Sequence, residues 1–216
     1  MSFGKILQLV RRVKYRRKRL NEVYHDLLKI LDLHEESLLD ELNYQGKTFK
    51  IEDEGQVVPI GEFARELKKA RIATGLSQVM EYKKAFKIAE ELYKQDLEEA
   101  KRIWDSNSNL RKQFTKLMKE MLVQNPNLDV LKKYEVFDAI KILSTFAIFY
   151  ILSEKCGYDE DITFYYKFML NEKLKDLREI NPLTVSRAAD FVAQVYRLNQ
   201  QEFREEVRKK LESLTL

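Results

Sequence analysis

The sequence has few of the residues that bend or crosslink a chain: six glycines, three prolines and a single cysteine, Cys156, among 216 residues. A β-sandwich or barrel of this length needs many more turn residues, and a dinucleotide-binding fold needs glycine-rich turns between its strands and helices. One cysteine cannot form a disulfide within the chain, which is typical of a protein in a reducing compartment. The scarcity of both helix breakers favours helices.

Signatures of the common catalytic and metal-binding sites are also missing. The chain has no phosphate-binding loop, dinucleotide fingerprint or zinc-ligand spacing, and no signature links Cys156 to a histidine base. His25 completes one Glu-x-x-His spacing with Glu22, but di-iron bundles need two such motifs. The corresponding position before His34, the other histidine, is Leu31. We therefore predict no catalytic site, no metal site and no cofactor, and a protein that is not an enzyme.

Long hydrophobic runs are absent as well. The longest, residues 142–152 (ILSTFAIFYIL), has eleven residues, whereas a membrane-spanning helix needs about 20. We interpret this run as part of a buried core helix. The N-terminus lacks the uninterrupted apolar segment and small-residue cleavage site of a signal peptide. These features predict a soluble intracellular protein, either cytoplasmic or associated with the nucleoid or nucleus.

What the sequence does have is a strongly uneven charge. The first nineteen residues contain eight Lys or Arg and no acid, so they carry +8; the first acid is Glu22. The remaining 197 residues contain 31 Lys or Arg and 35 Asp or Glu, so they carry −4. The natural partner of such an end is a polyanion.

Most of these cations, together with one aromatic residue, lie within residues 11–19, a segment that we call the basic arm. Cations in such a run can neutralise the phosphates of DNA or RNA, and an aromatic among them can stack on an unpaired base. Nothing in the segment indicates how base edges would be read, so we predict binding without sequence specificity. The predicted nucleic-acid-binding residues are Arg11, Arg12, Lys14, Tyr15, Arg16, Arg17, Lys18 and Arg19.

The same segment allows other interpretations. Phe3, Ile6, Leu7, Val10 and Val13 recur at helical spacing, and an apolar face beside cations can lie on an anionic membrane surface. An acid-free, Arg-rich start also resembles a mitochondrial presequence, and the run at residues 14–19 (KYRRKR) resembles a nuclear import signal. A helix whose charges are merely solvated is a further alternative. The runner-up function is a helical scaffold that assembles with protein partners or as a homo-oligomer, attached or not to a membrane.

Hydrophobic periodicity predicts an all-α fold, a bundle of about six or seven helices. The expected helices cover residues 3–42 (as one or two helices), 62–73, 77–104, 110–123, 128–155, 159–178 and 182–214. Residues 48–52 (TFKIE) alternate polar and apolar, residues 53–55 (DEG) can turn the chain and residues 57–60 (VVPI) can return it, which predicts a small β-hairpin with Pro59 at an edge or at the end of a strand. We expect residues 1–43 to be the arm leading into the bundle, 44–61 an insertion, and 62–216 the main helical domain.

Local signals define several boundaries. Gly75 is placed like a helix C-terminal glycine, and Ser77 like the N-cap of the next helix. Residues 106–109 (SNSN) are expected to form a loop. Asn181 followed by Pro182 indicates a helix start. The aromatic cluster at residues 164–168 is expected to pack in the core or in an oligomer contact.

One further segment resembles a known motif. Residues 60–78 (IGEFARELKKARIATGLSQ) are similar to the opening of a repressor-type helix-turn-helix, including its Gly-Leu-Ser-Gln element. In that family the element is typically followed by Leu, then Ala, and then a turn glycine. The Leu and Ala positions are occupied here by Glu81 and Tyr82, and no glycine follows before Gly157. We therefore interpret the segment as an ordinary corner between two helices.

Overall fold

The computed structural model describes residues 3–50, 55–124, 129–156 and 170–214; the side chains of residues 3–13, 124 and 154–156 are not included in the description. Within these ranges the fold is all-α with one small antiparallel hairpin, which confirms the predicted fold class. The helices are α1 (Phe3–Tyr44), α2 (Ile60–Leu76), α3 (Tyr82–Ser106), α4 (Ser108–Gln124), α5 (Val130–Cys156), α7 (Pro182–Val195) and α8 (Gln200–Ser213), and residues 170–176 are also helical.

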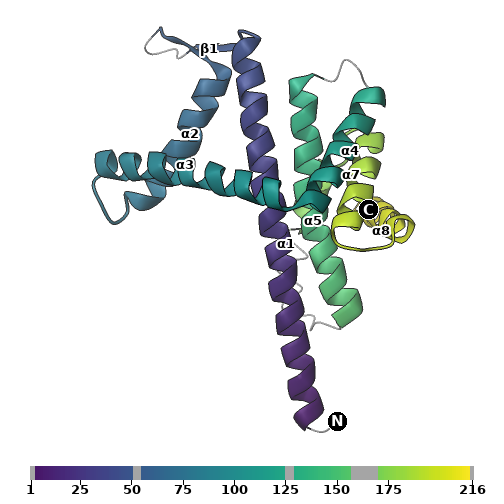
Figure 1. The fold of residues 1–216 in the computed structure, drawn as a ribbon. Helices are drawn as coiled ribbons and strands as arrows, with labels where there is room; N and C mark the ends of the chain where they lie inside the picture. Colours follow the sequence, from purple (N-terminus) through teal and green to yellow (C-terminus); the bar gives the residue numbers. More distant parts are fainter. Residues whose placement is uncertain (1–2, 51–54, 125–128, 157–169, 215–216) are drawn as a thin grey trace. The chain divides into compact units, whose positions relative to one another are not determined.

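The chain divides into two compact units. Unit 1 contains residues 1–27 and 108–216, and unit 2 contains residues 28–107. Helix α1 is a single uninterrupted helix (Figure 1), with its first part in unit 1 and the rest in unit 2. The cationic run at residues 14–19 therefore interrupts the apolar pattern but not the helix. Leu20, directly after this run, is buried.

Unit 2 holds the hairpin that alternation predicted. Strands β1 (Thr48–Lys50) and β2 (Val57–Pro59) pair antiparallel, with Pro59 as the last residue of its strand. Phe49 stacks on Phe63 of α2 with ring centroids 4.6 Å apart, so the two strands are supported by a helix, as so short a hairpin requires. Where α2 begins, a side chain on Gly61 would collide with the Leu39 carbonyl of α1.

The junction between α2 and α3 corrects two predictions. Gly75 lies inside the last turn of α2 rather than beyond its end, and Ser77 caps the C-terminus of α2 through its backbone N–H to Ala73 O. Helix α3 begins only at Tyr82. Both predictions relied on residue type alone. The small residues Ala73, Ala85 and Ala89, buried between α2 and α3, allow the two helices to pack closely.

Unit 1 is built around α5 and α7. Buried aromatic rings join their neighbours: Phe114 of α4 lies 6.0 Å from Phe137 of α5 and 5.9 Å from Phe191 of α7, between ring centroids. Phe203 of α8 lies 5.7 Å from Phe146 of α5. Helix α7 packs against α4, α5 and α8, and two clusters of aromatic rings, one with α4 and one with α8, lie against α5.

The C-terminal region both confirms and corrects the sequence analysis. Asn181 caps α7 by accepting a hydrogen bond from Leu183 N at 2.9 Å, as predicted. The single helix expected over residues 182–214 is instead two helices. Arg197 takes the left-handed conformation at φ 56°, and Asn199 caps α8 by accepting from Glu202 N at 3.0 Å. The Asn-x-x-Glu pattern of a helix start was present in the sequence and was overlooked.

One predicted loop is shorter than expected, and another predicted segment lies outside the described residues. The loop predicted at residues 106–109 is reduced to Asn107, which caps the C-terminus of α3 directly before α4. The first part of the helix expected over residues 159–178, up to residue 169, and the aromatic cluster at residues 164–168 lie outside the described residues.

Helix α5 is the most apolar helix. Within the described residues, Val130–Ser153 is the one helical segment long and apolar enough to cross a membrane by length and composition alone. More than half of its most apolar stretch is buried inside the protein. Its fully buried residues include Val136, Ile140 and Leu143.

Candidate functional site

Residues 14–19, the part of the basic arm whose side chains the structure describes, form an exposed helical segment. All six are classed as exposed, and the Tyr15 side chain is 69% exposed. Arg11 and Arg12 belong to the same helix, but their side chains lie outside the description. Cations lie on both sides of this segment, which is why none of its six residues is buried.

The arm contains few internal charge partners. Lys18 is 3.9 Å from Glu22, and both side chains are well exposed, so this pair contributes little to stability. Arg16 also interacts with another residue. Lys14, Arg17 and Arg19 form no ion pair with any residue that the structure describes. Three of the five cations at residues 14–19 are therefore not neutralised by any residue that the structure describes.

Helical geometry divides these six residues into two opposite stripes. At 100° per residue, Tyr15, Arg16 and Arg19 share one side of α1, and Lys14, Arg17 and Lys18 share the other. Neighbours on a stripe are three or four residues apart, about 5–6 Å between Cβ atoms. A phosphate backbone running along either side would meet cations held at fixed spacing, and only the first stripe also offers an aromatic ring.

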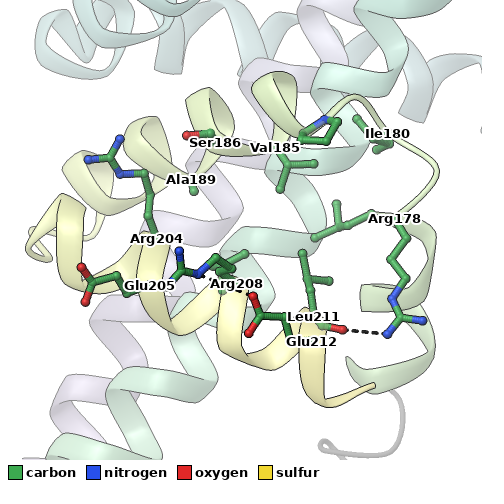
Figure 2. A pocket seen from close by; sticks show the side chains of 13 residues that line it. Arg178, Ile180, Val185, Ser186, Ala189, Arg204, Glu205, Arg208, Leu211 and Glu212 are labelled. Atoms are coloured by element: carbon green, nitrogen blue, oxygen red, sulfur yellow. Dashed lines mark hydrogen bonds and ion pairs between the residues drawn. The ribbon is translucent and has the colours of Figure 1, made fainter. Parts of the chain in front are cut away.

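A second feature, in unit 1, is a groove between α7 and α8 with a volume of about 480 Å³. Figure 2 shows apolar residues such as Val185 and Ala189 within it and arginines at its margin. Each arginine already has a partner. Arg178 donates to Leu211 O at 2.7 Å, Arg204 pairs with Asp190 at 3.1 Å, and Arg208 pairs with Glu212 at 3.7 Å.

The groove is therefore an apolar surface whose arginines already have hydrogen-bond or ion-pair partners within the protein. We assign no ligand to it. Sequence reasoning missed it because one helix was expected where α7 and α8 form two. A groove between two helices requires the turn at Arg197, which residue periodicity did not reveal.

Unit 2 contains a buried ionic network centred on Glu36, whose side chain is only 11% exposed. Arg65 Nε donates to its carboxylate at 2.9 Å and Lys68 Nζ at 3.0 Å. Arg65 also pairs with Asp40, and Lys68 with Glu35 at 2.9 Å. These contacts join α1 to α2. The adjacent acids Glu35 and Glu36 have the sequence pattern of a solvated helix face, but Glu36 is buried beside partners that lie 29 and 32 positions away along the chain.

The network shifts the pKa of its members in opposite directions. Burial alone would raise the pKa of Glu36, but Tyr93, Arg65 and Lys68 around it lower that pKa overall. The buried Tyr93 hydroxyl of α3 faces this carboxylate without a well-formed hydrogen bond, and its own pKa is raised by burial and by Glu36. Glu36 is thus held ionised, and Arg65 and Lys68 are held as cations. Groups held in one charge state in this way have a structural role rather than exchanging protons.

The remaining candidate residues are not brought into a site. His25 is exposed. His34 is half-buried against Trp104, with ring centroids 4.6 Å apart, and burial lowers its pKa to about 4. Among the residues that the structure describes, no group of three His, Cys, Asp or Glu could hold a metal ion. The side chain of Cys156 lies outside the described part.

Comparison with known proteins identified no relative: no protein-family model, no curated protein and no solved structure matches the chain.

Proposed function

We propose that this protein binds nucleic acid through its basic arm, contacting phosphates without sequence specificity, as a non-enzymatic component of a nucleoprotein assembly. The observation that carries the proposal is the exposed helical segment at residues 14–19, in which three of five cations form no ion pair with a described residue. Phosphate neutralisation provides most of the affinity in non-specific binding. Because cations lie on both sides of this helix, a polyanion can contact it from either side.

The arm suits a nucleic acid better than it suits other anionic surfaces. A helix that lies on a membrane needs an apolar face turned to the lipid. Residues 14–19 have Tyr15 as their one apolar side chain, and cations occupy both stripes. A nucleic acid demands no apolar face, because the contacts are with phosphates and, for single strands, with stacked bases.

Salt dependence tests the proposal directly. If about five arm cations neutralise phosphates, the logarithm of the association constant should fall with the logarithm of salt concentration with a slope of about −4 to −5 on duplex DNA. Fluorescence anisotropy with a short labelled duplex, measured across a range of salt concentrations from low to physiological and above, provides this slope. Absence of binding at the lowest salt concentration would refute the proposal.

Tyr15 distinguishes single-stranded from duplex partners. Tyr15→Ala should weaken binding to a single-stranded oligonucleotide by about 1–3 kcal/mol, roughly 5- to 150-fold, because base–aromatic stacking is lost. Duplex affinity should change little, since paired bases offer no face to the ring. The matched control is Tyr44→Ala at the other end of α1, where the side chain is 93% exposed. Equal losses for the two variants would show that Tyr15 has no special role.

A further inference from the structure

The turn between α2 and α3 exposes large apolar side chains next to lysines. Val79 is 81% exposed and Tyr82 is 49% exposed. Lys83, Lys84 and Lys87 follow within the first two turns of α3, and all three are exposed. We call these five residues the α2–α3 tip. It lies at the end of α2 opposite the β-hairpin (Figure 1).

The tip has a rigid base. Ala73, Ala85 and Ala89 are fully buried between the two helices, and Ile72, Leu76, Met80 and Phe86 pack against them. Val79 N donates to Leu76 O at 3.1 Å, which fixes the turn. The exposure of Val79 and Tyr82 therefore results from the geometry of a well-packed corner, which holds both side chains outward from the core of the pair.

The lysines of the tip are placed against the local electrostatics. The N-terminus of a helix carries partial positive charge, so cations are disfavoured in its first turn, where Lys83 and Lys84 lie. The N-cap of α3 is the acid Glu81, and the first turn itself contains no acid. Lys83, Lys84 and Lys87 form no ion pair with any residue in the described part of the chain. Residues 28–107, which make up unit 2, contain 13 Lys or Arg and 17 Asp or Glu. The tip is thus a cationic patch on a unit with an excess of acid.

We propose that the α2–α3 tip docks on an anionic lipid bilayer, with Val79 and Tyr82 entering the interface and the three lysines contacting acidic headgroups. An amphipathic surface binds such a membrane through buried apolar area together with electrostatic attraction. Tyrosine is favoured at the boundary between lipid and water, because its ring is apolar and its hydroxyl remains wet. Lysine side chains can extend from an apolar surface to the headgroups.

The apolar residues decide between a bilayer and a second nucleic-acid contact. The three lysines would suit either polyanion. Val79, the more exposed of the two apolar members of the tip, gains nothing from a phosphate backbone and offers no ring for stacking, whereas a bilayer removes it from water. The tip is separate from the basic arm, so this proposal does not depend on the proposed function.

Vesicle co-sedimentation of the full chain tests the proposal. The protein should bind vesicles of phosphatidylcholine mixed with phosphatidylglycerol and should not bind phosphatidylcholine alone. Replacing Lys83, Lys84 and Lys87 with Gln should lower the partition coefficient roughly 100-fold, because each cation at an anionic leaflet contributes about 1 kcal/mol and about 1.4 kcal/mol is tenfold. Replacing Lys94, Lys101 and Lys112 with Gln is the matched control: these lysines are also exposed, and the variant should bind like the wild type.

A Val79→Trp variant reports whether the turn enters the lipid. Trp104 is the one native tryptophan, and it is packed against His34, so new vesicle-dependent changes in the variant can be assigned to position 79 by difference from the wild type. The emission of the introduced indole should shift to shorter wavelength with anionic vesicles. Measurements should be repeated with the five cations of residues 14–19 replaced by Gln, which removes any attraction of vesicles to the arm.

Three results would overturn the proposal. The first is equal vesicle binding by the tip variant and its control. The second is an unshifted emission of the Val79→Trp variant at saturating vesicle concentration. The third is loss of DNA binding in the tip variant while vesicle binding is retained, which would assign the tip to a nucleic acid. Both triple variants change exposed residues only, so circular dichroism should show unchanged folding.

Discussion

Replacing the five cations of residues 14–19 with Gln is expected to lower duplex DNA affinity about 10⁴-fold at about 0.1 M salt. This estimate follows from counterion release: five phosphate contacts give a slope of about −4.5 in a plot of the logarithm of the association constant against the logarithm of salt concentration. A tenfold decrease in salt, from about 1 M to 0.1 M, therefore raises the electrostatic part of the association constant by more than about 10⁴-fold. The salt slope of the variant should fall to the contribution of the two arm cations that remain, Arg11 and Arg12, which is at most about −2. Because the changed side chains Lys14, Arg16, Arg17, Lys18 and Arg19 are all exposed, folding should be unaffected.

The control for this prediction removes the same charge elsewhere. Lys94, Lys101, Lys112, Lys119 and Lys173 are exposed, and replacing them with Gln produces the same change in net charge. If binding depended only on the total charge of the chain, the two variants would lose affinity equally, and the arm would have no special role. We expect the control to retain most of the affinity of the wild type in anisotropy titrations at one fixed salt concentration.

Replacing Glu36 with Ala is expected to lower the free energy of unfolding by about 3–5 kcal/mol, the cost of removing one partner from a buried ion pair. The reason is the surroundings of the carboxylate: Arg65 and Lys68 both donate to it, and its side chain is only 11% exposed. Without it, the two cations remain partly buried with fewer partners. Urea denaturation followed by Trp104 fluorescence is the appropriate measurement, because Trp104 lies in unit 2 with the network.

Two variants separate the buried network from ordinary surface charge. Glu66→Ala removes an exposed carboxylate that pairs with Lys69 at 2.7 Å, and should cost less than about 1 kcal/mol. Glu36→Gln keeps the shape of the side chain and should have an intermediate effect. If Glu36→Ala were no more destabilising than Glu66→Ala, the network would not be important for stability.

Acid dependence provides a second measure of the same network. The pKa of Glu36 is lower in the folded protein than in the unfolded chain, so its contribution to stability is complete above the unfolded value and is lost as pH falls through the folded value. The wild type should therefore lose stability below about pH 4.5, the ordinary value for Glu, more steeply than Glu36→Gln does. Urea midpoints measured from neutral pH down to below that value would show the difference.

Residue spacing and local signals predicted much of the secondary structure. The helical fold follows from apolar residues repeated at helical spacing, as in the buried Leu27, Ile30, Leu31 and Leu38 of α1. The hairpin and the start of α7 at Asn181 were predicted correctly because turn and cap signals act over a few residues. The exposure of residues 14–19 was also predictable, because charge on every side of a helix cannot be buried.

Other features depended on packing between distant residues. The split of the last predicted helix into α7 and α8 has a local signal, the Asn199 cap with Glu202 three residues later, but the apolar pattern alone runs through the turn at Arg197 without interruption. The Glu36 network joins α1 to α2 through pairs 25 to 33 residues apart. The exposure of Val79 depends on how Ala73, Ala85 and Ala89 bring α2 and α3 together.

The sequence by itself therefore determined that the chain is helical and that its cationic segment must face outward, since both follow from residue type and short-range spacing. The tertiary structure decided which charges are neutralised and which are left exposed. Glu36, Arg65 and Lys68 compensate one another inside unit 2, while Lys14, Arg17 and Arg19 form no ion pair with a described residue. That distinction requires distances in space, because the strength of an electrostatic interaction depends on separation and burial rather than on order along the chain.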